Sequence, residues 1–386
     1  MKPVMVVVLV DALGWSLVGH DAAFAPVLAE RRPLATVLGF SSGALPTAFT
    51  GKLAREHGRW LMYRRAPEGG GVFRGLEWLR WLPARLRQSW RLTQWLTAQV
   101  ARRVRGYFNL YEVPREELPA FDLPEQSDIF APGGLPCDSL WDSLERRKLA
   151  WQGWNWRTSE PEARAQALAA LERGGHDLVF VYSAVLDARL HHEGTQGAGV
   201  RTNVAEWSRW FGDAADAARR AGREPWLYLC SDHGMVDVTR TVDVMRALEA
   251  LPVARGRDYL AFFDSTMARF WWHTPAAREA VRAALGPAQH GRWLAPQDLA
   301  EAGADFADHR YGDDVFLLDP GVLMVPSYMG RAPLAAMHGY DPTHPDMPGV
   351  LMSNRPLPPA TTHLSHLRAF LEQELDALSA AGSGAA

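Results

Sequence analysis

Three apolar runs in the chain are unbroken by polar residues, and each predicts a buried strand. They are Val4–Val10, Leu178–Tyr182 and Trp226–Cys230. The first run is rich in β-branched residues and shows no alternation, which is typical of a strand covered on both faces of a parallel sheet. Val350–Met352 is a shorter candidate for a fourth strand.

Helical patterns precede two of these strands. Glu160–Arg173 leads into the second run and Asn203–Ala221 into the third. Strands that alternate with helices predict an α/β fold with a mostly parallel central sheet flanked by helices. A further helix is expected to begin near Ser41, although Pro46 interrupts its pattern.

Residues 61–150 break this rhythm and predict an inserted helical cap. The stretch Arg74–Arg105 holds eight Arg, one Glu and four Trp, with leucines at helical intervals, so we expect two helices split near Pro83. The core then comprises residues 1–60 and 151–375, with a second small insertion over 256–330. The Ala/Gly/Ser-rich end, residues 378–386, predicts a disordered tail.

Composition excludes some classes of function. The net charge is −3, so no strong positive field indicates specific nucleic-acid binding. The two cysteines, Cys137 and Cys230, form at most one bridge, which favours a reducing, cytoplasmic location over a disulfide scaffold. Val4–Val10 is too short to cross a bilayer, and no small-residue cleavage site follows it.

Acidic and imidazole side chains follow the predicted strands or lie in adjacent loops. The candidates are Asp11, Asp187, His191, Asp232, His233 and His338. Ligands of open α/β sheets bind at the carboxyl ends of the strands. Oxygen and imidazole donors suit zinc, and also manganese or iron.

Each candidate has a purely structural alternative when taken alone. Asp11 and Asp187 are also plausible helix caps, and the pair Asp232-His233 also fits a polar turn. His192 is an alternative to His191 as a ligand. His338 is a weak candidate when taken alone, and so is His344, six residues later. Ser41 and Ser42 both fit a helix N-cap, where backbone N–H groups also favour phosphate.

Taken together and in this order, the clusters resemble the alkaline phosphatase superfamily, and most closely its type I phosphodiesterase/nucleotide pyrophosphatase branch. The family pattern is a first Asp, a Ser or Thr nucleophile, Thr-Gly nine residues later, Asp-x-x-x-His, Asp-His-Gly and a late His-Gly. The pair Thr50-Gly51 selects Ser41 over Ser42 as the nucleophile. The resemblance covers residues 1–60 and 176–354 and leaves out the cap.

The resemblance implies two divalent metal ions, with zinc favoured and manganese as the alternative. One ion would be held by Asp11, Ser41, Asp232 and His233. The other would be held by Asp187, His191 and His338. It also implies that a metal-activated Ser41 attacks the phosphorus and forms a phosphoseryl intermediate, with no side-chain general base.

Three functions remain open. A phosphodiesterase or pyrophosphatase is favoured, because no phosphate-clamping Arg is identifiable and a diester has one charge less to balance. A phosphomonoesterase with the same site is the second hypothesis. The third is a non-catalytic, metal-containing protein that binds a lipid or a partner.

The cap, residues 61–150, is expected to decide the substrate, a small-molecule phosphoester of unknown identity. Its Arg- and Trp-rich pattern has three interpretations. It fits an ordinary cap with Arg on its wet face, a site for an anionic substrate such as a nucleotide or lipid-linked phosphate, or a segment that lies on an anionic membrane surface.

Overall fold

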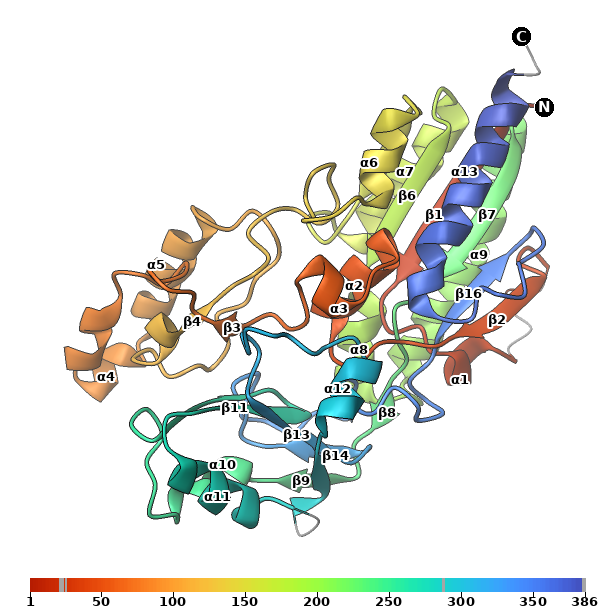
Figure 1. Ribbon diagram of the computed structural model, residues 1–386. Coiled ribbons are helices and arrows are strands. Elements are labelled where there is room, and N and C mark those ends of the chain that lie inside the picture. The colour runs from red at the N-terminus through yellow and green to blue at the C-terminus, as the bar shows by residue number, and fades with distance from the viewer. Residues whose placement is uncertain (21–23, 25, 287–288, 384–386) are drawn as a thin grey trace.

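The computed structural model describes residues 1–20, 24, 26–286 and 289–383, and a six-stranded sheet forms its centre (Figure 1). The strand order is β2-β16-β7-β1-β6-β5. The bounds are β1 Pro3–Val10, β2 Glu30–Leu34, β5 Trp151–Trp154, β6 Leu178–Ser183, β7 Glu224–Cys230 and β16 Gly349–Ser353. Parallel pairs join β1 to β6 and β7, and β5 to β6, whereas β16 runs antiparallel to β7 and β2. The predicted α/β class with a mostly parallel sheet is confirmed.

The side chains of β1 pack against two separate helical layers, because successive side chains of a strand point to opposite faces of the sheet. Val4, Val6 and Val8 pack in a cluster with the helices that follow β5 and β6. Met5 and Val7 pack in a second cluster on the other face. The first layer holds α7 (Glu160–Arg173), α8 (Val185–Glu193) and α9 (Ala198–Arg220); the second holds α2 (Ser41–Thr50), α6 (Leu140–Arg146) and α13 (Leu367–Ser383).

A second, smaller sheet lies within the expected insertion 256–330. Its order is β10-β11-β13-β12, and its pairs are antiparallel. The bounds are β10 Tyr259–Phe263, β11 Met267–Trp272, β12 Gly291–Trp293 and β13 Asp314–Leu318, with α10 Val244–Glu249, α11 Pro275–Ala284 and α12 Pro296–Glu301 beside them. Short elements complete the core and its junction with this body: α1 Trp15–Val18, α3 Ala54–His57, β8 Val236–Asp237, β9 Arg240–Val242, β14 Val322–Met324, β15 Ala336–Met337 and η5 Leu364–His366.

The cap has shorter helices than the sequence predicts. Its elements are β3 Arg64–Arg65, η2 Glu77–Trp81, α4 Ala84–Arg87, α5 Trp90–Ala101, η3 Leu118–Ala120 and β4 Phe121–Asp122. The expected break near Pro83 is present, and a second break follows because Ser89 caps α5 by accepting a hydrogen bond from the Leu92 N–H. Leu96 and Phe121 share one hydrophobic cluster with Phe262 and Trp271, so the cap and the second sheet pack as one body.

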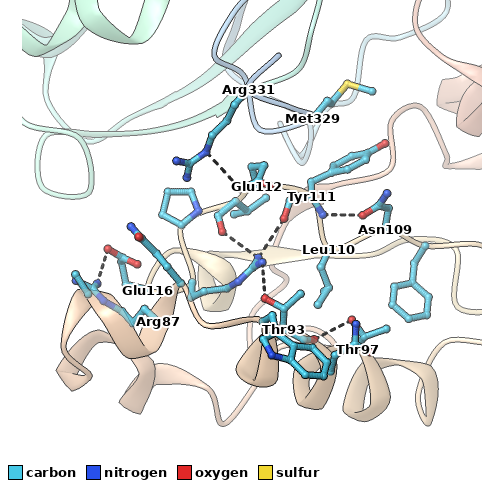
Figure 2. Close-up of a pocket in the computed structure, with 18 of the residues that line it drawn as sticks. Arg87, Thr93, Thr97, Asn109, Leu110, Tyr111, Glu112, Glu116, Met329 and Arg331 are labelled. Atoms are coloured by element: carbon cyan, nitrogen blue, oxygen red, sulfur yellow. Dashed lines mark hydrogen bonds and ion pairs between the residues drawn. The ribbon is translucent and has the colours of Figure 1, made fainter. Parts of the chain in front are cut away.

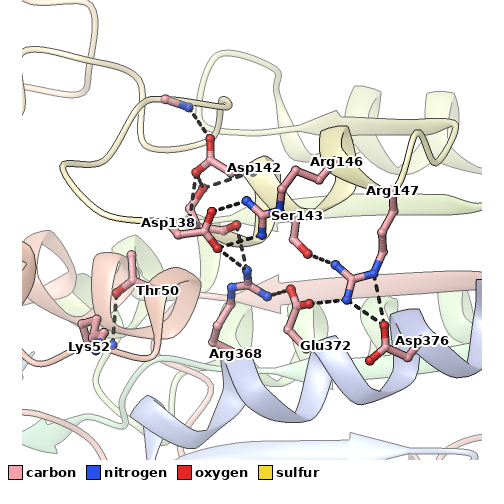
Figure 3. A network of polar contacts seen from close by, with 12 residues as sticks. Thr50, Lys52, Asp138, Asp142, Ser143, Arg146, Arg147, Arg368, Glu372 and Asp376 are labelled. Carbon is pink, nitrogen blue, oxygen red and sulfur yellow. Dashed lines mark hydrogen bonds and ion pairs between the residues drawn. The ribbon is translucent and has the colours of Figure 1, made fainter.

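The last part of the expected cap packs on the core instead. Leu140, Trp141 and Leu144 of α6 are buried in the cluster that contains Met5 and Val7 of β1. Figure 3 shows a polar network that ties α6 to α13. It joins Arg146 to Asp138, Arg368 to Asp138, and Arg147 to Glu372 and Asp376. Packing therefore divides residues 61–150 between the cap and the core.

The C-terminal segment is helical where the sequence predicts a tail. Helix α13 continues to Ser383, and Leu378 is buried against the sheet. The expectation of disorder from residue 378 is therefore wrong as far as Ser383, because the Ala/Ser-rich composition hid the buried face of a helix. Residues 384–386 lie outside the described residues.

The longest described helix, α9, is amphipathic rather than wholly apolar. Val204, Trp207 and Phe211 are buried, whereas Arg209 and Asp213 are exposed. No helix in the described part of the chain is both long and apolar enough to cross a membrane.

Candidate active site

Ser41 is the first residue of α2, and the helix start aims its hydroxyl at the carboxyl ends of the central strands. Ser41 Oγ lies 3.0 Å from His233 Nε2 and 3.3 Å from Asp11 Oδ1. Ser42 turns away and donates to the carbonyl of Trp60 at 3.3 Å. Pro46 lies inside α2 without ending it. The structure therefore places Ser41, rather than Ser42, among the acidic and imidazole candidates.

Asp11 follows β1 directly and is almost fully buried. Its Oδ2 accepts a hydrogen bond from Tyr182 Oη at 2.6 Å, and its Oδ1 accepts one from Ser41. Burial, reinforced by the charges of Asp232 and Asp187, raises the pKa of Asp11 well above its usual range. The neighbouring carboxylates thus oppose the ionisation of Asp11, and a nearby positive charge would favour its ionised form.

The hydrogen bonds of the Asp232 carboxylate indicate whether a cation fits this site. Its Oδ1 accepts hydrogen bonds from the backbone N–H groups of Ala12 and His233 at 3.3 and 3.1 Å. Its Oδ2 is buried and accepts no hydrogen bond from the described residues, and His233 Nε2 lies 3.4 Å from it. A buried carboxylate oxygen without a donor is costly, and a metal ion removes that cost. The donor chemistry of this site therefore fits a divalent cation.

Two groups of ligand atoms lie close enough to hold metal ions. Asp11, Asp232 and His233 form one group, and Asp187, His233 and His338 form the other, with the ligand atoms of each group within 4.8 Å of one another. The rings of His233 and His338 stack with centroids 3.8 Å apart. The groups are thus adjacent and share His233, whereas the resemblance assigns His233 to the first ion alone.

Backbone carbonyls orient two of the imidazoles. His233 Nδ1 lies 2.9 Å from the carbonyl of Gly234, and His191 Nδ1 lies 2.9 Å from the carbonyl of Ala336. A proton on each Nδ1 satisfies these contacts and leaves Nε2 as a lone-pair donor, which is the form that binds metals. His191 Nε2 then points to Asp187 Oδ1 at 3.3 Å.

Asp187 and His191 share a face of α8, as their four-residue spacing predicts. Asp187 Oδ1 also lies 3.6 Å from His338 Nε2. Burial alone would raise the pKa of Asp187, but in the metal-free protein the adjacent His191 imidazole holds it below the usual range. Burial, followed by the charge of His233, lowers the pKa of His338 well below its ordinary value, so His338 is neutral and available as a ligand.

Glycines allow the ligand-bearing turns to pass close to other backbone. Gly234 follows His233, and a Cβ there would lie 2.0 Å from the carbonyl oxygen of Asp346. Gly339 follows His338 with φ +85°, and a Cβ there would meet the ring of Phe40. A side chain at either position would displace the neighbouring ligand, which explains the Asp-His-Gly and His-Gly patterns.

A cavity of about 280 Å³ opens over these ligands. Its walls combine aromatic and other apolar side chains, and Tyr107 and Trp156 stand at the exposed end with their rings 5.5 Å apart in an edge-to-face arrangement. Glu125 lies in the wall and accepts a hydrogen bond from the Tyr107 N–H at 3.1 Å. Among the described residues that line this cavity, none is Lys or Arg.

A larger polar cleft of about 990 Å³ continues from this cavity beneath the cap. Both are lined by Tyr111 and Met329, which lie at the junction between them. Figure 2 shows the floor of the cleft, where Arg87 pairs with Glu116 and Arg331 with Glu112. Most charges in the cleft are therefore already neutralised by neighbours.

Several residues of the site are absent from the motifs. Tyr182, which donates a hydrogen bond to Asp11, ends the apolar run Leu178–Tyr182, so its position at a strand end was a usable signal. Tyr107, Glu125 and Trp156 carry no sequence signal, because they come from segments that meet only in the folded chain. Phe40 contacts His338 edge-to-face with centroids 5.3 Å apart.

The two remaining histidine candidates lie outside the ligand groups. His192 is exposed on the outer face of α8. His344 lies in another depression beside Asp346, where its Nδ1 accepts a hydrogen bond from the Asp346 N–H at 3.3 Å.

Comparison with known proteins identifies a family model that matches this chain. The family model described as Type I phosphodiesterase / nucleotide pyrophosphatase matches residues 44–341, a span that begins after Asp11 and Ser41 and includes the other candidate ligands. No curated protein matches the sequence.

Solved structures match the fold over nearly the whole chain. Murine ectonucleotide pyrophosphatase / phosphodiesterase 5 matches with a TM-score of 0.66 and 16% identity, and the human protein with 0.65 and 13%. An inactive variant of the murine protein in complex with AMP gives 0.66 and 16%. Each match covers 97% of this chain and 95% of the other.

Proposed function

The chain belongs to the type I phosphodiesterase / nucleotide pyrophosphatase family and is therefore a phosphoric ester hydrolase, and we propose that it is a metal-dependent phosphodiesterase or pyrophosphatase acting through Ser41. The observation that carries this proposal is the position of Ser41 Oγ, within 3.3 Å of both Asp11 and His233 at the start of a helix. A hydroxyl there lies beside the ligands of one ion and at the positive end of the helix dipole.

Two divalent ions, zinc in the first place and manganese as the alternative, fit the acidic and imidazole groups. Asp11, Ser41, Asp232 and His233 would hold one, and Asp187, His191 and His338 the other, with His233 adjacent to both. When bound, the ions lower the pKa of the Ser41 hydroxyl and neutralise charge on the phosphate oxygens.

Ser41 Oγ then acts as the nucleophile. It forms a bond to phosphorus while the bond from phosphorus to the leaving oxygen breaks, which leaves a phosphoseryl group. Water hydrolyses this group, releases the phosphomonoester product and regenerates the serine. The N–H groups at the start of α2 face the same region and can bind a phosphate oxygen during both steps.

The charge of the cavity favours a diester over a monoester. No Lys or Arg is present among the described residues that line it, whereas Glu125 adds a carboxyl group and Asp264 is paired with Arg269 at 2.8 Å. A dianionic monoester would therefore depend on the ions alone for compensation. A monoanionic diester carries one charge less and fits this lining better.

The retained group of the substrate is proposed to be a nucleoside. Tyr107 and Trp156 offer aromatic surface at the mouth of the cavity, and planar bases stack on such surfaces. The murine relative forms a complex with AMP, which supports the same substrate class here.

A paired substrate assay tests the proposal. Zinc-loaded and manganese-loaded protein would be incubated with bis-p-nitrophenyl phosphate, p-nitrophenyl phosphate and the p-nitrophenyl ester of a nucleoside 5′-monophosphate. We expect the nucleotide ester to give the highest kcat/KM and the monoester the lowest. A clear preference for the monoester would assign the site to a phosphomonoesterase, and inactivity with every ester and both metals would overturn hydrolysis itself.

A further inference from the structure

The cap exposes four tryptophans within one short stretch of chain. The exposed fractions are 76% for Trp81, 71% for Trp90 and 44% for both Trp78 and Trp95, and Leu86 beside them is 53% exposed. Isolated apolar residues are ordinary on a protein surface, but a group of large ones in one segment marks a contact site.

These side chains are not core residues that failed to pack. The same elements bury Leu79, Leu96 and Val100 in the cluster shared with the second sheet. The inner face of η2 and α5 is therefore already satisfied, and the tryptophans lie outside it, with Trp90 at the rim of the polar cleft. Trp78 and Trp95 contact each other, with ring centroids 6.2 Å apart.

Basic side chains surround the same aromatic residues. Arg80, Arg85 and Arg91 are exposed, and no carboxylate of the described residues pairs with any of them. The guanidinium of Arg80 lies 4.8 Å from the centroid of the Trp81 ring. In the polar cleft beneath, by contrast, Arg87 is paired with Glu116. Unneutralised positive charge is thus concentrated on the outer face.

The outer face also lies where a flat surface can reach it. Figure 1 shows α4 and α5 at an edge of the molecule, away from the central sheet and from both ends of the chain. Tryptophan with arginine is the combination that settles at a bilayer interface, since the indole enters the headgroup boundary and the guanidinium stays with the phosphates.

We propose that this outer face, which we call the Trp–Arg face, docks the protein on an anionic phospholipid bilayer. It comprises four tryptophans, one leucine and three arginines: Trp78, Trp81, Trp90, Trp95, Leu86, Arg80, Arg85 and Arg91. The proposal does not depend on the reaction at Ser41, because none of these residues lines the cavity over the metal groups.

Charge complementarity favours an anionic bilayer over a neutral bilayer or a second copy of this chain. Each arginine near an anionic surface strengthens binding, and apolar insertion holds the protein once it has arrived. A neutral bilayer would use the tryptophans but not the arginines. A second copy of this chain would bring the same positive charge and repel it.

Vesicle co-flotation of the whole protein tests the docking. The probes are vesicles of phosphatidylcholine alone and of phosphatidylcholine mixed with phosphatidylglycerol, each at low and high salt. We expect binding to the mixed vesicles to exceed binding to the neutral ones by about tenfold at low salt and to fall as salt screens the arginines.

Two double variants separate the charge from the apolar contribution. Arg85→Glu with Arg91→Glu should lower binding to the mixed vesicles by about tenfold or more. Trp81→Ser with Leu86→Ser should lower it by about fivefold and leave the remaining binding more sensitive to salt. Arg219→Glu with Arg220→Glu makes the same change of charge on exposed side chains of α9 and serves as the matched control.

Circular dichroism and hydrolysis of bis-p-nitrophenyl phosphate report whether the variants remain folded. Equal binding to neutral and mixed vesicles, or equal losses in the α9 control, would overturn the proposal. So would a lipid-free dimer in size-exclusion chromatography that disappears in the Trp81/Leu86 variant, since the face would then serve a second copy of the chain.

Discussion

Unbalanced charge is buried at the carboxyl edge of the central sheet but exposed to solvent on the Trp–Arg face. At the sheet edge, Asp11 and Asp232 are buried, and the charge of Asp232 opposes the ionisation of Asp11. On the cap, Arg85 and Arg91 are exposed and surrounded by water. Buried charge needs a compensating ion at a fixed position, whereas exposed charge is screened and acts over a broad surface. Chemistry is therefore expected at the first region and only adhesion at the second.

The largest effect should come from removing the nucleophile. Ser41→Ala should lower kcat for a diester by at least about 1,000-fold, because no other hydroxyl of the described residues contacts both the Asp11 and the His233 side chains. Steady-state kinetics with bis-p-nitrophenyl phosphate measure this. Ser42→Ala is the matched control, since Ser42 donates to Trp60 and should keep activity within a few fold. Equal losses in the two variants would mean that the wrong serine is assigned.

The next effect concerns the buried charge itself. Asp232→Asn keeps the oxygen that accepts the backbone N–H groups but replaces the carboxylate oxygen that accepts no hydrogen bond and lies 3.4 Å from His233 Nε2. We expect loss of bound metal, seen by elemental analysis, and a fall in activity of about 100-fold. In metal-free protein the same change should raise Tm, because it relieves repulsion with Asp11. Asp216→Asn, exposed on α9, is the control, and full metal content in Asp232→Asn would contradict the ligand assignment.

The same contrast explains what the sequence could predict. Asp11, Asp232 and His233 were visible because they follow predicted strands, and parallel strands bring their carboxyl ends to one edge, whereas His338 was assigned only through the family pattern. Tyr107, Glu125 and Trp156 were not visible, because no local pattern indicates which distant segments form the cavity wall. The role of α6 was hidden as well, since its apolar spacing resembles that of the cap and only its contacts with β1 place it on the core.

A pair of leucines sharpens the boundary between the two regions. Leu144 of α6 is fully buried on the core sheet, whereas Leu86 of the cap is exposed. Leu144→Ala should lower the free energy of unfolding by about 2–5 kcal/mol, and Leu86→Ala should change it by no more than about 0.5 kcal/mol. Denaturant titration measures both. Similar losses in the two variants would show that the Trp–Arg face is covered in the folded protein.

The smallest effect lies where the cap meets the site, at Glu125. Burial raises the pKa of Glu125 to about 7, so its carboxyl group is neutral in acid and becomes charged as the pH rises through that value. The new charge repels an anionic diester in the cavity, so KM should rise a few fold from about pH 6 to pH 8. Glu125→Gln removes this ionisation and should flatten the profile of KM while leaving kcat nearly unchanged. Glu116→Gln, in the polar cleft, is the control. A profile that keeps its shape in Glu125→Gln would assign the pH dependence to the metal ligands, and the cap would then take no part in the electrostatics of the site.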